Sequence, residues 1–194
     1  MFSSIMQSIP TLQYGEKFIL GIDGLSRSGK TTCVKHLGKE LEKHEVPYVI
    51  FHIDDYIVER NKRYHTGREE WFEYCYLQWD IDWLQDYFFR LLKINNEITL
   101  PFYKDETDTH ETKCVTLPKT GIIIIEGVFL QREEWKSYFD FVLYLDCPKE
   151  KQFLRERKET QQNIKKFQER YWKAEEYYIQ AVSPAKVANL VLHG

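Results

Sequence analysis

Short apolar runs alternate with amphipathic segments along the chain, which is the pattern of an α/β protein. Residues 17–23 and 46–53 are rich in apolar and β-branched side chains, and residues 121–126 read Gly-Ile-Ile-Ile-Ile-Glu. Runs of this kind are typical of parallel strands that are buried on both faces. The apolar runs at 139–146 and 187–192 predict two further strands of the same sheet.

Three segments have apolar side chains at helical spacing and are predicted to be helices: 32–41, 80–93 and 161–182. We interpret the stripe on the last of these as core packing. The alternation of strands and helices predicts a doubly wound, mostly parallel α/β sheet with helices on both faces, in a single domain over residues 1–194. The stripe consists of Ile164, Phe167, Tyr171, Ala174, Tyr178 and Ala181.

The segments between these elements are more polar. Residues 98–102 are predicted to form a short strand. We expect it at the edge of a sheet, because Pro101 has no N–H to donate inside a central strand. Residues 104–113 are expected to be a charged loop. The long segment 54–80 is polar and carries many aromatic residues, and its charged cluster at 59–63 could simply be a solvated face.

Net charge, the length of the apolar runs and the cysteine spacing indicate which partners and which cellular compartment to expect for this protein. The net charge of −3 argues against bulk binding to nucleic acid or to anionic membranes. No apolar run reaches the roughly 18 residues of a membrane span, and no Lys or Arg precedes Lys17, so a signal peptide is not expected. The four cysteines lack metal-binding spacing and fit reduced thiols of a cytoplasmic protein. Assembly into a homo-oligomer stays open.

The sequence Gly-Leu-Ser-Arg-Ser-Gly-Lys-Thr at 24–31 matches the phosphate-binding template G-x-x-x-x-G-K-[ST]. It lies between a predicted strand and a predicted helix, where backbone N–H groups and the helix dipole attract phosphate. Lys30 would contact the terminal phosphates, and the Thr31 hydroxyl could bind Mg²⁺. The alternative is an ordinary glycine-rich turn. The residues expected to bind nucleotide are Gly24, Ser26, Arg27, Ser28, Gly29, Lys30, Thr31 and Thr32.

A phosphate-binding loop occurs in GTPases, motor ATPases and small-molecule kinases alike. A GTPase would be expected to show D-x-x-G and N-K-x-D motifs. The sequence contains no D-x-x-G, and residues 61–64 read Asn-Lys-Arg-Tyr, which lacks the final acid. These observations argue against a GTPase.

Acidic residues follow two of the predicted strands. Asp54 and Asp55 come after the second strand, and Glu126 ends the isoleucine run. Ligands of open α/β sheets bind at such strand ends. One carboxylate could hold Mg²⁺ and another could take the proton of an attacking hydroxyl, so the pair fits phosphoryl transfer. The alternative is that these acids only cap the following turns.

Together these motifs resemble the uridine kinase and phosphoribulokinase-like branch of P-loop kinases. The loop at 24–31 matches the family pattern G-x-S-x-S-G-K-[ST], and His-Ile-Asp-Asp-Tyr at 52–56 resembles the family's Q-D-S-F-Y. The resemblance implies that Asp54 is the acceptor-side base and that Glu126-Gly127 is the family's E-G element. It spans most of the chain, from residue 18 to residue 192.

The same resemblance implies a mobile lid and a substrate-contacting segment. Arg155 and Arg157 match the arginine-rich lid, and Pro-Phe-Tyr-Lys at 101–104 resembles P-x-Y-D, which makes Tyr103 a candidate substrate contact. A basic solvated face is the alternative for the arginines, and a half-buried ring for Tyr103. Lys104 replaces the family's Asp, and the longer stretch 103–110 leaves His110 without a clear counterpart. His65, Arg68 and Trp71 follow Asp54 and are further acceptor-side candidates.

We therefore expect an ATP- and Mg²⁺-dependent kinase that phosphorylates a hydroxyl of a small molecule, with a nucleoside as the favoured acceptor. Asp54, Lys30, Arg155 and Arg157 are the predicted catalytic residues, and Thr31 and Glu126 the predicted metal ligands. The preference for ATP follows from the resemblance alone. Two alternatives stay open: a P-loop kinase of a vitamin precursor or sugar, and a nucleotide-binding regulatory module without catalysis.

Overall fold

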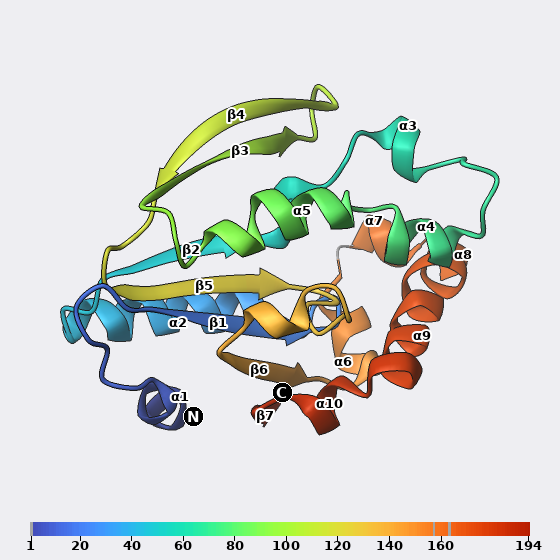
Figure 1. The fold of residues 1–194 in the computed structure, drawn as a ribbon. Helices are drawn as coiled ribbons and strands as arrows, with labels where there is room; N and C mark the ends of the chain where they lie inside the picture. Colours follow the sequence, from blue (N-terminus) through green and yellow to red (C-terminus); the bar gives the residue numbers. More distant parts are fainter. Residues whose placement is uncertain (1, 157, 163) are drawn as a thin grey trace.

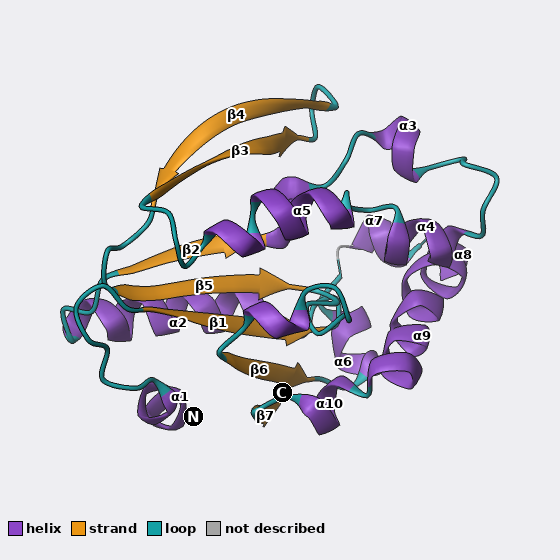
Figure 2. Cartoon of the chain, viewed as in Figure 1, coloured by secondary structure: helices purple, strands orange, loops and turns teal. Residues whose placement is uncertain are grey.

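The core of the protein is a five-stranded sheet in the order β2-β5-β1-β6-β7, in which every neighbouring pair is parallel (Figures 1 and 2). The computed structural model describes residues 2–156, 158–162 and 164–194. The predicted doubly wound parallel sheet is confirmed. Its strands are β1 (Lys17–Gly24), β2 (Tyr48–His52), β5 (Gly121–Gly127), β6 (Phe141–Asp146) and β7 (Leu190–His193).

Helices cover both faces of this sheet. Because side chains alternate along a strand, Ile122 and Ile124 pack on one face and Ile123 and Ile125 on the other, all of them fully buried. The first face is covered by α1 (Phe2–Ser8) and α2 (Lys30–Lys43). The second is covered by α4 (Glu70–Tyr76), α5 (Ile81–Tyr87) and α9 (Lys173–Val182).

The predicted helix over 80–93 is shorter in the structure. Helix α5 runs from Ile81 to Tyr87 and is preceded by its N-cap Asp80, whose side chain accepts a hydrogen bond from the N–H of Trp83 at 3.0 Å. A 3₁₀ turn, η2 (Phe89–Leu91), follows. The adjacent Phe88 and Phe89 are both buried, and they pack against Phe51 and Trp135 respectively. Burying both rings explains why the regular helix stops before them.

The prediction of a charged loop at 104–113 is wrong. Strand β3 (Glu97–Lys104) pairs antiparallel with β4 (Thr109–Thr116), and the two form a separate hairpin that stands apart from the central sheet (Figure 1). Pro101 is accommodated because this sheet has only two strands. The side chains of β4 are mostly exposed, so the strand lacks the apolar pattern that would have predicted it.

The C-terminal part of the chain is helical, as predicted. Segments α6 (Lys149–Leu154), α7 (Lys158–Gln161), α8 (Ile164–Lys166) and a π-helical stretch, η4 (Phe167–Trp172), lead into α9; α10 (Pro184–Val187) then precedes β7. The core interpretation of the stripe is right for Phe167, Ala174 and Tyr178 and wrong for Ile164, which is 42% exposed, and for Ala181. In the described ranges no helix has the length and apolar character needed to cross a bilayer.

Candidate active site

The loop between β1 and α2 has the geometry of an anion cradle. Gly29 has a φ of +103°, in the left-handed region that favours glycine, and α2 begins directly after it without a side-chain cap. The first N–H groups of the helix are therefore left to bind an anion. Lys30 folds back over the loop, and its ammonium donates to the carbonyl of Leu25 at 2.9 Å.

Gly24 is needed where the strand enters the loop. A Cβ at this position would lie 2.7 Å from Oγ of Ser28 and 2.9 Å from the carbonyl oxygen of Leu145. The close approach of these atoms leaves no space for a larger residue. The loop is thus packed against β6 as well as against itself.

The parallel register brings two acids to the loop. Strand β5 lies between β1 and β2, so Glu126 stands opposite Ile22 on one side and His52 on the other. Its Oε1 accepts a hydrogen bond from the Thr31 hydroxyl at 3.3 Å and lies 2.6 Å from Nδ1 of His52. The contact with Glu126 raises the pKa of His52, and partial burial opposes it.

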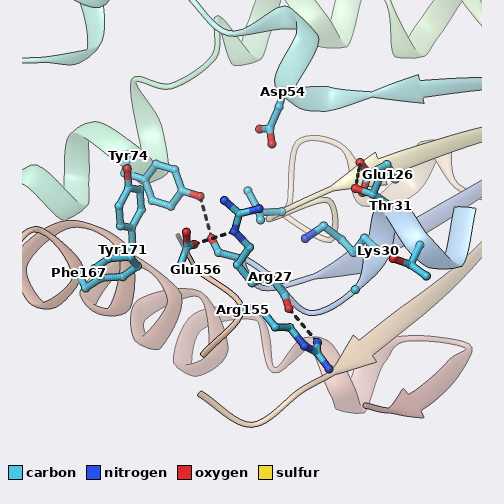
Figure 3. Close-up of a pocket in the computed structure, with 14 residues that line it drawn as sticks. Arg27, Lys30, Thr31, Asp54, Tyr74, Glu126, Arg155, Glu156, Phe167 and Tyr171 are labelled. Atoms are coloured by element: carbon cyan, nitrogen blue, oxygen red, sulfur yellow. Dashed lines mark hydrogen bonds and ion pairs between the residues drawn. The ribbon is translucent and has the colours of Figure 1, made fainter. Parts of the chain in front are cut away.

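Asp54 lies in η1 (Ile53–Tyr56), the 3₁₀ turn that directly follows β2. It lines a cavity of about 610 Å³ together with Lys30, Thr31 and Glu126. Figure 3 shows the Asp54 carboxylate pointing into this cavity from the side opposite the loop. The side chain is accessible through the cavity, while the surrounding protein raises its pKa by desolvation and the charge of Lys30 opposes that rise.

The residues present fit a magnesium ion. Glu126 and Thr31 offer oxygen ligands side by side, and Oε2 of Glu126 is buried without a hydrogen-bond partner in the described part of the chain. Mg²⁺ prefers oxygen and usually keeps few protein ligands, the rest coming from water and phosphate. In the described residues no cluster of three or more His, Cys, Asp or Glu could hold a metal alone. A metal here would be shared with a bound phosphate.

An aromatic wall closes the cavity on the side away from Lys30. It consists of Tyr74 from α4 and of Phe167 and Tyr171 from η4 (Figure 3). The rings of Tyr74 and Tyr171 are perpendicular with centroids 4.9 Å apart, and the Tyr74 hydroxyl lies 3.3 Å from Oγ of Ser26. Sequence reasoning missed this wall, because helical periodicity cannot distinguish rings that fill a core from rings that line a cavity.

Arg155, the arginine predicted to contact the phosphate, lines the cavity and contacts the loop. The Arg155 guanidinium donates to the carbonyl of Arg27 at 3.0 Å and lies 3.3 Å from Sγ of Cys147. The next residue, Glu156, forms an ion pair with the side chain of Arg27. Arg157 lies outside the described residues.

Unlike Asp54, the further acceptor-side candidates Tyr103, His65 and Arg68 do not line this cavity. The Tyr103 hydroxyl donates to Asp108 at 2.8 Å and accepts from Arg63 at 3.2 Å. His65 borders a separate cavity of about 410 Å³, and the guanidinium of Arg68 lies over the ring of Phe72. Whether any of the three contacts substrate stays a prediction.

Comparisons with known proteins agree on one family. The model of the phosphoribulokinase / uridine kinase family matches residues 19–190. A uridine kinase from Borrelia garinii is 28% identical over 71% of this chain, which spans 64% of that relative's length. A solved structure of a possible uridine kinase from Bacillus stearothermophilus is 51% identical, with a TM-score of 0.85 over 97% of this chain and 94% of the other. D-glycerate 3-kinase from Cryptococcus neoformans shares the fold at 10% identity, with a TM-score of 0.59 over 99% of this chain and 91% of the other.

Proposed function

Because the chain belongs to the phosphoribulokinase and uridine kinase family, we propose that it transfers the terminal phosphoryl group of ATP to a hydroxyl of a small molecule, with a nucleoside as the acceptor. One observation carries this proposal. A single cavity joins the phosphate-binding loop, through Lys30 and Thr31, to two carboxylates, those of Glu126 and Asp54. Phosphoryl transfer needs a phosphate grip, a metal site and an acceptor-side acid within reach of one another.

The donor half is the loop and the space beyond it. Backbone N–H groups at the start of α2 and the Lys30 ammonium would hold the β- and γ-phosphates. A second cavity of about 500 Å³ shares Gly29, Thr32 and Arg155 with the first and is also lined by His36 and Leu192. We place the nucleoside part of the donor there, because that cavity continues from the phosphate site away from Asp54.

Thr31 and Glu126 would hold Mg²⁺ against the phosphates. When bound, the ion neutralises charge that develops on the phosphate oxygens. The protein's own part is to keep the Glu126 carboxylate in place. It does so through the contact with His52 on one side and with the Thr31 hydroxyl on the other.

The acceptor half lies between Asp54 and the aromatic wall. Asp54 would orient the attacking hydroxyl and accept its proton as the bond to phosphorus forms. A nucleoside fits because the rings of Tyr74 and Tyr171 offer an apolar surface to a planar base. Most of the catalysis would then come from positioning and electrostatic stabilisation. A cytoplasmic location, where ATP is available, is part of this proposal.

A second candidate is a kinase of the same construction that acts on a non-nucleoside alcohol. The specific observation that favours it is the position of Tyr103, which is hydrogen-bonded to Asp108 and Arg63 outside the cavity and so leaves the acceptor region without this predicted contact. The hairpin of β3 and β4 would then stabilise the fold and take no part in reading the acceptor.

ADP release measured against a panel of nucleosides, sugars and vitamin alcohols tests both candidates. The proposal expects Mg²⁺-dependent turnover with a nucleoside that disappears in Lys30→Met. Turnover only with other alcohols would replace the first candidate with the second. Tight ATP binding with no acceptor-dependent turnover across the panel would contradict both and would indicate a regulatory nucleotide-binding module.

A further inference from the structure

Arg27 is the third of the four variable residues in the phosphate-binding loop, and its backbone is unusual. Its φ is +58°, in the left-handed region that residues other than glycine rarely adopt. Its side chain lines the cavity that holds Lys30 and Asp54. Figure 3 shows the guanidinium between Glu156 and Lys30 in this view. Strained backbone conformations of this kind gather at functional sites.

Two consecutive residues, Arg155 and Glu156, bind the backbone and the side chain of Arg27 respectively. Glu156 accepts a hydrogen bond from Nε at 2.8 Å, and Arg155 donates to the Arg27 carbonyl at 3.0 Å. The Glu156 side chain is only 10% exposed, whereas that of Arg27 is 50% exposed. In the described part of the chain, Glu156 is the one side chain that the Arg27 guanidinium binds. The two terminal amino groups of the guanidinium are therefore available to a ligand.

We propose that Arg27 is a further catalytic residue that contacts the γ-phosphate of the donor. Until the nucleotide binds, its guanidinium is paired with Glu156. This role rests on the proposed phosphoryl transfer. A guanidinium matches phosphate oxygens with two parallel hydrogen bonds, and a triphosphate carries more negative charge than one carboxylate. The donor can therefore displace Glu156 from Arg27. The cation that stabilises the transferring phosphoryl group would then come from the loop itself.

The contacts of Arg155 suit a positioning role, whereas the sequence predicted a direct catalytic one. Its guanidinium binds the backbone of Arg27, so it supports the left-handed conformation of the loop. Arg155 would position Arg27, and Arg27 would contact the phosphate. Because Glu156 and Arg155 are adjacent, a movement of this segment would act on the side chain and the backbone of Arg27 together.

The test compares Arg27→Gln, Glu156→Gln and the double variant, with Arg90→Gln as the control. Arg90, in η2, forms an exposed ion pair with Asp86 of α5 at 3.1 Å, outside the cavity. Affinities for ATP and ADP are measured by calorimetry without an acceptor, and kcat and KM with one. Circular dichroism verifies that each variant is folded.

We expect Arg27→Gln to weaken ATP binding more than ADP binding and to lower kcat by about 10²-fold, the usual effect of removing one such donor. Glu156→Gln should tighten ATP binding several-fold, and this gain should vanish in the double variant. Unchanged ATP affinity and kcat in Arg27→Gln would overturn the proposal, as would an equal gain from Glu156→Gln in both backgrounds. Since ATP binding is measured without an acceptor, failure to find an acceptor would contradict the proposed function, while the ATP affinities of the three variants would still decide whether Arg27 contacts the donor.

Discussion

The carboxylate of Glu175 on α9 accepts a hydrogen bond from the backbone N–H of Ser26 in the phosphate-binding loop at 2.8 Å. Three residues further along the same helix, the Tyr178 hydroxyl donates to Asp23 at 2.6 Å. Asp23 is buried at the end of β1 and also accepts from the N–H of Gly24. One helix, more than 140 residues away in sequence, therefore fixes both the end of the strand and the start of the loop.

Glu175→Ala should loosen the loop. It leaves the N–H of Ser26 without its partner, and a lost buried hydrogen bond of this kind costs about 1–3 kcal/mol. ATP binding must then order a looser loop, so part of the lost energy is subtracted from the binding free energy. We expect KM for ATP to rise about tenfold, while kcat changes little. Glu175→Gln keeps an acceptor oxygen and should restore KM. Equal KM values in the wild type and the Ala variant would show that Glu175 does not hold the loop in its ATP-binding conformation.

The same carboxyl should make stability depend on pH. Burial raises the pKa of Glu175 in the folded protein. Its stabilising contribution is therefore complete below the unfolded-state pKa, about 4.3, and is lost as pH rises through the folded-state pKa. Relative to Glu175→Gln, the wild type should lose unfolding free energy as pH is raised from about 4.3. Urea unfolding over a pH series measures this.

The matched control for that series is Glu97→Gln, because Glu97 is exposed on β3. It removes an exposed carboxyl and so serves as the reference for the pH dependence of Glu175→Gln. A Glu175→Gln difference with no more pH dependence than this reference would show that burial does not disfavour the charged carboxylate.

Asp54→Asn should separate acceptor activation from nucleotide binding. The amide keeps the shape of the side chain and cannot accept the acceptor's proton, so we expect turnover to fall by about 10²-fold or more. ATP affinity should be retained, because the phosphate-binding groups are on the loop. Asp55→Asn is the control, since Asp55 is adjacent but does not line the cavity. Unchanged turnover in Asp54→Asn would exclude Asp54 as the base.

Gly127→Ala should disturb the turn that carries Asp54. A Cβ at Gly127 would lie 2.1 Å from Cγ2 of Ile53, the fully buried first residue of η1. Overpacking of this kind costs about 1–3 kcal/mol, and the shift of η1 should also lower kcat. Urea unfolding and steady-state kinetics measure the two effects. An Ile53→Ala background removes the contact with Cγ2 and leaves only the Cβ of residue 53, at 3.1 Å. The cost should therefore shrink there, and an undiminished cost would contradict the steric explanation.

The donor half of the site could be predicted from the sequence because each part has a local signal. The loop motif is contiguous, and the buried parallel strands that flank it are apolar at successive positions. Thr31 and Glu126 are brought together by the pairing of β1 with β5. The run of isoleucines at 122–125 had indicated a buried parallel strand there, but not its neighbour. Parallel neighbours end at the same edge, so acids at strand ends could be expected to meet the loop.

The remaining parts depend on packing between distant segments, which has no local signal. Strand β4 faces solvent and therefore lacks an apolar pattern. In the sequence, Glu175 is one of several charged residues on an amphipathic helix. In the fold it is only 3% exposed, and its carboxylate contacts the loop. The contact of Arg155 with the Arg27 carbonyl likewise requires the backbone geometry of the loop.

The sheet divides the core into two clusters of buried side chains. The cluster under α2 consists of residues of β1, α2, β5 and β6 together with Ile5. The cluster on the other face contains Leu25 of the loop together with residues of η1, α4 and α9, the elements that carry Asp54, Tyr74 and Glu175. A change of packing on this second face would therefore reach the proposed acceptor side and the loop together, which ties the evolution of acceptor recognition to that of the phosphate-binding loop.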